Sequence, residues 1–243
     1  MTTDPRRGRL DARPGVVASA GPTGMHLLSL QAPRDAFLYV PGTARAPMPL
    51  ALVLHGSGGE ARHGIELLQA AADAHGVVLL APASTRYTWD VILGGFGPDV
   101  ALVDAALARA FLDYPVGAVA IAGFSDGASY ALSLGLANGD LFDHVLAFSP
   151  GFLEVPTRRG RPRVYVSHGR RDTVLPIETC GRRIARTLRL DGYDVQYYEF
   201  DGGHVVPDEA ARSALGRLGR REALDAGNAA RADAPASDSP RTG

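Results

Sequence analysis

The sequence contains no lysine, so all 25 of its basic residues are arginine. A Walker A phosphate loop, a pyridoxal phosphate Schiff base and a lysine-dependent aldolase each need a lysine side chain, and all three are excluded. The chain has one cysteine, Cys180, which excludes an internal disulfide bond and a cysteine zinc site. Cys180 falls in a helical pattern with Ile177, Ile184 and Leu188. We therefore expect it to be a small buried core residue rather than a nucleophile.

Long apolar runs and an excess of one charge are also missing. No stretch reaches the roughly 18 apolar residues that span a bilayer. The N-terminus lacks the apolar region that a signal peptide requires, and the run after Arg6 and Arg7 is too short for a twin-arginine signal. The formal net charge is -1, which does not steer the protein towards nucleic acid or an anionic membrane. These features predict a cytoplasmic protein with no membrane span and no nucleic-acid partner, and leave a homodimer open.

The length of 243 residues and the hydrophobic content of 46% fit one domain with a full core. Residues 1–23 are rich in Arg, Pro, Gly and Ala and predict a flexible segment, and residues 221–243 predict a disordered tail. Between them, residues 24–220 alternate strand and helix patterns, which predicts an α/β fold with a mostly parallel sheet of about eight strands and helices on both faces. The predicted strands are 25–30, 37–40, 50–54, 77–81, 118–124, 145–148, 163–167 and 195–200.

A G-x-S-x-G pentapeptide, Gly123-Phe124-Ser125-Asp126-Gly127, joins the apolar run 118–122 directly to the helical stretch 128–137. A strand that runs straight into a helix leaves room only for a sharp turn. Such a turn strains the backbone at the serine and exposes its hydroxyl above the end of the sheet. The pentapeptide therefore predicts a nucleophile elbow with Ser125 as the nucleophile.

A serine nucleophile needs a base and a third group that orients the base, in the chain order Ser, Asp or Glu, His. Asp172 lies in a loop after the predicted strand 163–167, and His204 follows the strand 195–200 behind two glycines. All three candidates come just after strand ends, where open α/β sheets place their sites. Ser125, Asp172 and His204 are the predicted triad. Asp201 is the rival acid, but it is only three residues from His204 and more readily braces that loop.

The strand 50–54 runs into His55-Gly56-Ser57-Gly58-Gly59, where such folds carry one donor for the oxyanion. We assign the two oxyanion N–H groups to Ser57 and to Asp126, the residue after the nucleophile. His55 and His168 both precede a glycine at a strand end. We expect them to be structural hydrogen-bonding groups rather than the base.

Together, the His55 to Gly59 loop, the pentapeptide around Ser125, the segment from His168 through Asp172 to Pro176, and Gly203-His204 resemble α/β-hydrolases of the phospholipase/carboxylesterase group. The polyhydroxybutyrate depolymerase and feruloyl-esterase-like branch is close by. The resemblance covers roughly residues 25 to 220 and implies the α/β-hydrolase fold. Within the group the residue after the serine is often Gln or Ala, so Asp126 leaves the sub-branch and the substrate open.

This reading predicts a serine hydrolase that cleaves carboxylic esters through an acyl-enzyme, with a small-molecule ester as partner and no metal or organic cofactor. The same triad could act on thioesters, hydroxybutyrate polyesters or feruloyl esters, and a non-catalytic binding protein is the alternative from another class. Residues 149–162 are too few for a cap domain. Trp89 and Phe152 are candidates to line an acyl pocket, with ordinary packing as the alternative. The arginines of 158–163 are expected to be solvated.

Overall fold

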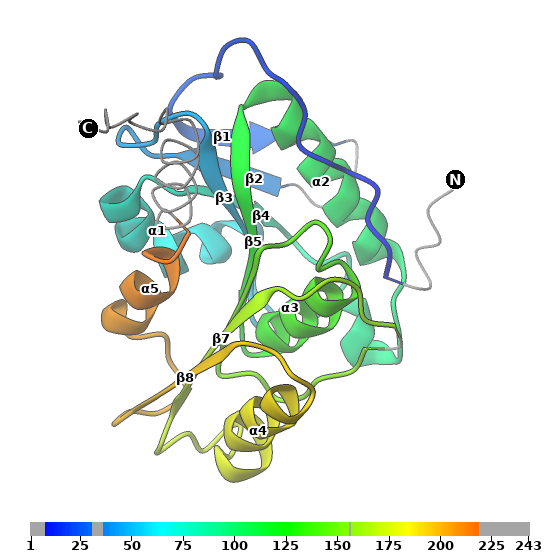
Figure 1. Ribbon diagram of the computed structural model, residues 1–243, viewed down its shortest axis with the longest axis vertical. Coiled ribbons are helices and arrows are strands. Elements are labelled where there is room, and N and C mark those ends of the chain that lie inside the picture. The colour runs from blue at the N-terminus through cyan, green and yellow to red at the C-terminus, as the bar shows by residue number, and fades with distance from the viewer. Residues whose placement is uncertain (1–7, 31–35, 156, 219–243) are drawn as a thin grey trace, which may run out of the picture.

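The computed structural model describes residues 8–30, 36–155 and 157–218, and these form one sheet flanked by helices (Figure 1). Each strand predicted from the sequence is present, with ends shifted by two residues or fewer. The strands are β1 Gly24–Leu28, β2 Ala36–Val40, β3 Met48–Leu54, β4 Val78–Pro82, β5 Val116–Phe124, β6 His144–Phe148, β7 Arg163–Gly169 and β8 Val195–Phe200.

The eight strands lie in the order β1-β2-β4-β3-β5-β6-β7-β8. β2 pairs antiparallel with both β1 and β4, and all other neighbours pair parallel. Parallel neighbours need crossover connections, which the helices supply. The predicted mostly parallel α/β sheet is therefore confirmed. Its parallel part brings the carboxyl ends of β3, β5, β7 and β8 to one edge.

Helices cover both faces of the sheet (Figure 1). Two apolar layers show which helix covers which face: α1 and α5 pack in one layer, and α2, α3 and α4 in the other. The helices are α1 Ala61–His75, α2 Pro98–Asp113, α3 Asp126–Ala137, α4 Arg183–Leu190 and α5 Asp208–Leu215, with short turns η2 Asp90–Leu93 and η3 Glu178–Arg182.

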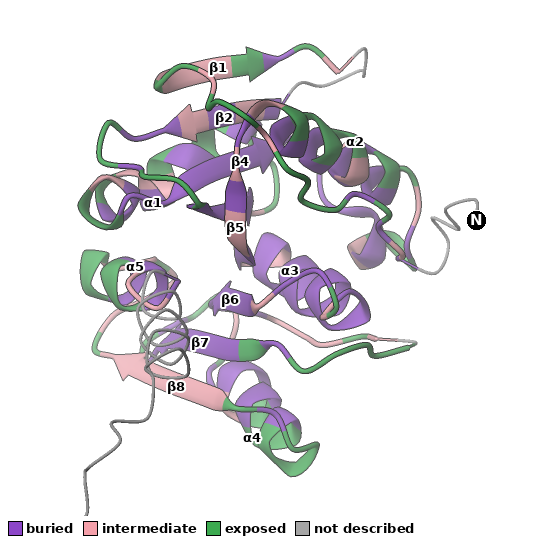
Figure 2. Cartoon of the chain, turned by 45° about the horizontal axis from the view of Figure 1, so that its top comes forward, coloured by how far each residue is buried: buried purple, intermediate pink, exposed green. Residues whose placement is uncertain are grey.

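Burial follows the position of each strand in the sheet (Figure 2). All seven residues of β3 are buried, as expected for a central parallel strand that is covered on both faces. All six residues of the edge strand β8 are only half-buried. Cys180 is buried, as its helical pattern predicted. The strand before the Ser57 loop is thus buried along its whole length, and most of β5, which precedes Ser125, is buried as well.

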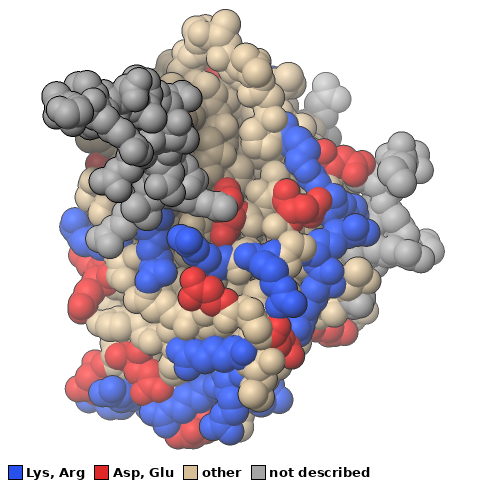
Figure 3. Space-filling view, in the orientation of Figure 1, with Lys and Arg blue, Asp and Glu red and all other residues tan. Residues whose placement is uncertain are grey.

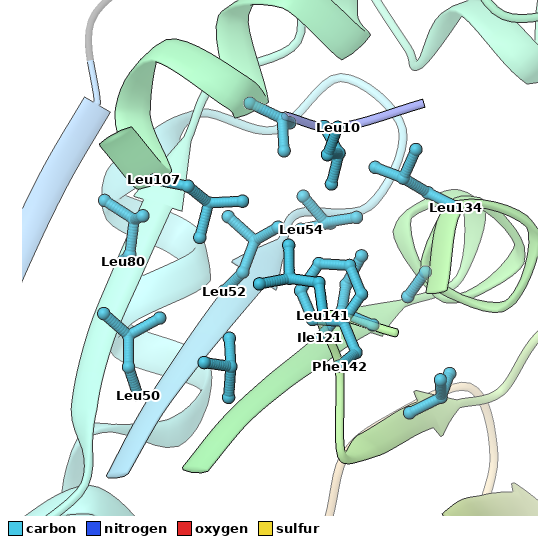
Figure 4. Close-up of a cluster of buried hydrophobic side chains, with 14 of the residues drawn as sticks. Leu10, Leu50, Leu52, Leu54, Leu80, Leu107, Ile121, Leu134, Leu141 and Phe142 are labelled. Carbon is cyan, nitrogen blue, oxygen red and sulfur yellow. The ribbon is translucent and has the colours of Figure 1, made fainter. Parts of the chain in front are cut away.

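Residues 8–12, which fall in the stretch 1–23 that the sequence predicts to be flexible, pack against the rest of the chain. Leu10 is fully buried among leucines of the sheet and of α2 and α3 (Figure 4). Its N–H donates to Asn138 Oδ1 at 2.9 Å, and Asn138 Nδ2 donates to the Gly8 carbonyl at 2.7 Å. The N–H groups of Asp11 and Ala12 both donate to one carboxylate oxygen of Asp104 at 2.8 Å. This part of the chain is packed because one leucine and several side-chain acceptors hold it; residues 1–7 lie outside the described residues.

Three further sequence predictions concern the C-terminal tail, the connection between β6 and β7, and membrane spans. The predicted tail 221–243 lies outside the described residues. Between β6 and β7, the described residues of 149–162 hold only an isolated bridge from Gly160 to Gly139 and no helix. None of the described helices combines the length and the apolar character that a membrane crossing needs.

Charged side chains of both signs are interspersed over the lower part of the face seen in Figure 3. In the loop before β7, Arg158 pairs with Asp191 at 2.6 Å, and Arg161 donates to the Asp191 carbonyl at 2.6 Å. Both guanidinium groups also lie over the ring of Tyr193, at 5.7 and 5.0 Å from its centroid. These arginines are exposed, as predicted, and they also bind the turn after α4.

Candidate active site

Ser125 occupies the turn between β5 and α3, with φ 56° and ψ -119°. A positive φ is strained for a residue with a side chain, and such strain gathers at functional sites. The turn is held because the Ser125 N–H donates to the Phe148 carbonyl at 3.0 Å. A Cβ at Gly123 would collide with the Gly127 carbonyl, and one at Gly127 with the Leu54 carbonyl. Both flanking glycines are therefore required by the close approach of backbone segments.

The structure brings the three predicted triad residues together. His204 Nε2 lies 2.9 Å from Ser125 Oγ, and His204 Nδ1 lies 2.7 Å from Asp172 Oδ2. The serine follows β5, the aspartate follows β7 and the histidine follows β8, so parallel strands deliver all three to one sheet edge. The ring of Phe124 packs against the His204 ring at 4.7 Å between centroids. The imidazole is thus held between a hydroxyl and a carboxylate.

The Asp172 carboxylate is buried and surrounded by donors. Its Oδ1 accepts the N–H groups of Val174 and Leu175, each at 2.9 Å. Burial alone would raise the pKa of Asp172, but the Leu175 N–H, the His204 ring and the Val174 N–H outweigh it and lower that pKa. Asp172 is therefore an anion that can orient and stabilise a protonated His204. The rival acid, Asp201, has a side chain that is 75% exposed and pairs with Arg171 at 3.0 Å.

The predicted oxyanion loop follows β3 and is fixed by the ring of His55. The Ser84 N–H donates to His55 Nε2 at 2.9 Å, so Nε2 is unprotonated, and Nδ1 donates to the Gly56 carbonyl at 2.7 Å. The Gly58 N–H donates to the Tyr87 carbonyl at 2.8 Å. Within the described part of the chain, the N–H groups of Ser57 and Asp126 have no hydrogen-bond acceptor. Their assignment as oxyanion donors stays a prediction.

The two candidates for an acyl pocket lie in different surroundings. Trp89 is fully buried, stacks on Tyr130 at 5.1 Å between centroids, and donates its indole N–H to the His55 carbonyl at 2.8 Å. Of the two interpretations left open for Trp89, these contacts support ordinary packing, because the ring lies in the core and supports the oxyanion loop. Phe152 is half-buried against the core, and its role in substrate binding stays a prediction.

The segment 84–99 supports the site in ways that the sequence did not indicate. Thr88 Oγ1 donates to Asp126 Oδ2 at 2.7 Å, which ties this segment to the nucleophile elbow. The exposed ring of Tyr87 lies over Gly58 in the oxyanion loop. These contacts join residues about 30 to 40 positions apart. The sequence carries no spacing signal for them.

Two buried carboxylates brace the same segment. Asp99 accepts the N–H groups of Thr85 and Asp90 at 2.6 and 2.8 Å. Asp90 Oδ2 accepts the N–H groups of Gly97 and Asp99 at 2.8 and 2.9 Å. Burial and then the nearby charge of Asp99 raise the pKa of Asp90 to about 6. No cation pairs with Asp90 among the described residues.

A sheet of this strand order with a serine at a strained strand-to-helix turn is the α/β-hydrolase fold. Comparison with solved structures leads to the same fold. The chain is similar to the S-formylglutathione hydrolase FrmB of Staphylococcus aureus, with 15% identity over 81% of this chain and 99% of that chain and a TM-score of 0.63.

Two further solved structures share the fold. The ferulic acid esterase of Anaeromyces mucronatus is 16% identical over 90% of this chain and 96% of its own, with a TM-score of 0.55. The protein TT1662 of Thermus thermophilus is 25% identical over 82% of this chain and 98% of its own, with a TM-score of 0.60. No protein-family model matches the chain, and no curated protein matches its sequence.

Proposed function

We propose that the protein is a serine hydrolase that cleaves carboxylic esters through an acyl-enzyme. The observation that carries the proposal is the position of His204, within hydrogen-bond distance of both Ser125 Oγ and Asp172 Oδ2. A serine hydroxyl is a weak nucleophile until a neighbouring base takes its proton. The buried, anionic Asp172 holds that base with Nδ1–H towards the carboxylate, which leaves Nε2 free to accept.

The first half of the reaction forms the acyl-enzyme. Ser125 Oγ attacks the ester carbonyl carbon while its proton passes to His204 Nε2, and the carbonyl oxygen becomes an oxyanion. The N–H groups of Ser57 and Asp126 are the proposed donors to this oxyanion. When the tetrahedral intermediate collapses, the bond to the alcohol oxygen breaks, and His204 Nε2 returns the proton to the departing alcohol.

Water completes the cycle through the same groups. His204 Nε2 takes a proton from the water molecule as its oxygen attacks the acyl carbon. The bond from that carbon to Ser125 Oγ then breaks, and the proton returns to the serine while the carboxylic acid leaves. Asp172 stays ionised throughout and stabilises the imidazolium that forms in each half. Neither half of this proposed reaction requires a cofactor.

For the substrate, we propose a small or extended ester that reaches an accessible site. Support comes from the short connection 149–162, whose described residues hold no helix that could act as a lid. Two proteins of similar fold are named S-formylglutathione hydrolase and ferulic acid esterase. A thioester and an aromatic ester are therefore alternative substrate classes for the same chemistry. A hydroxybutyrate polyester is a third variant.

Hydrolysis of p-nitrophenyl esters and labelling by a fluorophosphonate probe test the proposal. Ser125→Ala is expected to abolish both, because it removes the nucleophile and little packing. Ser133→Ala is the matched control: it changes a buried serine within α3, about two turns beyond Ser125, and should leave both signals intact. Unchanged turnover in a folded Ser125→Ala variant would reject the assignment and favour a hydrolase-fold binding protein.

Rates on esters from acetate to palmitate test the substrate class. An accessible site gains at most roughly 0.8 kcal/mol for each fully buried methylene, so we expect the preference to flatten or reverse beyond short chains. Activity should rise smoothly with dissolved ester and show no jump when micelles form. Interfacial activation with a long-chain optimum would instead indicate a lipase. Feruloyl ester, acyl thioester and hydroxybutyrate oligomer complete the panel.

A further inference from the structure

His168, near the end of β7, lies beside Asp172 but outside the proposed triad. Its Nε2 lies 2.7 Å from the carbonyl oxygen of Leu175. Because a carbonyl oxygen only accepts, Nε2 carries the ring proton and donates it. Nδ1 is buried and has no hydrogen-bond partner among the described residues. A buried ring nitrogen without a partner is rare and calls for a physical reason.

Packing on the Nδ1 side keeps the ring neutral. A Cβ at Gly181 would lie only 2.6 Å from Nδ1, so the Gly181 backbone packs directly against this edge of the ring. A second proton at Nδ1 would be buried there without an acceptor. Burial accordingly lowers the pKa of His168. His168 is therefore a neutral imidazole with a fixed Nε2–H tautomer.

The protonated edge of this ring faces the proposed triad acid. His168 Nε2 lies 3.3 Å from Asp172 Oδ2, and both side chains are 0% exposed. Oδ2 is the same oxygen that accepts from His204 Nδ1. Leu175, whose carbonyl accepts the His168 proton, donates its own N–H to Asp172 Oδ1 at 2.9 Å. His168 thus contacts one carboxylate oxygen and holds the peptide that binds the other.

We propose that His168 is a positioning residue for this hydrolase and acts through Asp172, which it fixes so that Oδ2 faces His204. The inference rests on the proposed function, since it gives His168 a part in the same reaction. A neutral N–H edge stabilises the carboxylate, whereas an imidazolium at this place would repel the positive charge that His204 acquires during catalysis. Glu199 of β8, the strand neighbour of His168, is a further charged group near the ring and is paired with Arg182 at 2.7 Å.

Two substitutions at His168 separate the N–H group from the shape of the ring. His168→Leu removes the donor, and kcat should fall on the order of 10²-fold, the cost of misplacing a reacting group by about 1 Å. The acid limb of kcat/KM should also move to lower pH, because a carboxylate that no longer faces His204 holds the imidazolium less strongly. His168→Gln restores an N–H donor near the place of Nε2. It should recover most of kcat and the original limb.

Gly181→Ala tests the same idea without changing the histidine or the loop, in case His168→Leu does not fold. The new Cβ would displace the His168 ring, so kcat and the acid limb should change in the same direction as in His168→Leu. Arg183→Ala, an exposed position in the following helix turn, is the control and should match the wild type. Fluorophosphonate labelling rates should follow kcat across the series, while circular dichroism reports folding.

The outcomes are distinct from those that test the proposed function. If the proposed function is wrong, the wild type will not react with fluorophosphonate, and its activity will not depend on Ser125. If the wild type passes both tests, folded His168→Leu or Gly181→Ala variants with wild-type kcat and acid limb would overturn the role of His168. A Gln variant as impaired as the Leu variant would also overturn it, because the effect would then belong to the shape of the ring.

Discussion

The loop after β7 and the loop after β4 each bury an aspartate near the proposed site, and the two carboxylates respond to burial in opposite ways. Asp172 accepts two backbone N–H groups and the His204 ring, and its pKa is lowered. Asp90 also accepts two backbone N–H groups, but burial and then the charge of a second carboxylate, Asp99, raise its pKa to about 6. Burial and backbone donors are common to both. The neighbouring side chain, an imidazole at Asp172 and a carboxylate at Asp90, adds to the effects of burial and backbone donors and helps to keep only Asp172 an anion.

The difference also separates two ways in which a loop can support a site. The loop after β7 supplies a charge to the reaction through Asp172. The loop after β4 supplies shape: its carboxylates bind backbone N–H groups, Trp89 supports His55, and Thr88 binds Asp126. Changes in the first loop should therefore appear in kcat, and changes in the second mainly in the free energy of unfolding.

The largest expected effect comes from exchanging each aspartate for asparagine and comparing kcat. Asp172→Asn should lower kcat on the order of 10⁴-fold, because the amide donates to His204 Nδ1 and leaves the wrong tautomer facing Ser125. Asp90→Asn should leave kcat within about threefold of the wild type, a change below the 1.4 kcal/mol that corresponds to a factor of ten. Initial rates on p-nitrophenyl acetate measure both variants.

Asp201→Asn is the control for Asp172→Asn, since Asp201 is the exposed carboxylate of the neighbouring loop. It should retain wild-type kcat. A damaging Asp201→Asn beside a mild Asp172→Asn would show that the triad acid is wrongly assigned. A large loss of kcat in Asp90→Asn would remove the distinction between the two loops.

The next effect is on stability and depends on pH. Because the folded pKa of Asp90 is raised from 3.8 to about 6, the folded protein binds more protons than the unfolded chain between these values, and its stability falls as pH rises through them. The full penalty, about 3 kcal/mol at 1.36 kcal/mol per pKa unit, is present above pH 6. Asp90→Asn should therefore raise the free energy of unfolding at pH 8 by up to that amount, and its advantage should vanish near pH 4.

Urea unfolding at pH 8 and at pH 4 measures this effect. Asp172 has the opposite sign: its lowered pKa means that it stabilises the folded state at neutral pH, and this contribution is lost as pH falls through that lowered value. Asp201→Asn again serves as the exposed control. An Asp90→Asn variant that is destabilised equally at both pH values would show that the charge of Asp90 does not lower the free energy of unfolding.

The sequence predicted the parts of the molecule that repeat a local pattern. Strand and helix periodicities located the sheet, and the turn glycines placed Ser125 at the elbow, because the required backbone contacts lie within a few residues. Leu10 was missed because it is a single apolar residue in a polar, arginine-rich stretch, and its acceptor Asn138 is 128 positions away. The surroundings of Trp89 were left open for a related reason. An aromatic residue in a loop gives no signal of whether it faces substrate or the core.

The smallest effect concerns the hydrogen bond from Thr88 to Asp126, where the shape-giving loop after β4 meets the elbow. Thr88→Val removes the hydroxyl with little change in volume and leaves a half-buried carboxylate oxygen without its donor. A hydrogen bond to a charged group contributes about 1.5 to 3 kcal/mol, and exposure of Asp126 to solvent places the expected loss at the lower end. The backbone of Asp126 is one of the proposed oxyanion donors, so kcat should also fall, by less than about tenfold.

Thr88→Ser keeps the hydroxyl and should restore both the stability and kcat of the wild type. Urea unfolding and initial rates on one short-chain ester, measured on all three proteins, decide the matter. If Thr88→Val loses stability without any change in kcat, the loop after β4 gives shape to the fold but not to the oxyanion donors. If kcat falls far more than tenfold, this hydrogen bond positions the Asp126 N–H directly. The loop after β4 then contributes to the reaction as well as to stability, and the contrast between the two loops is smaller than the pKa values of Asp172 and Asp90 suggest.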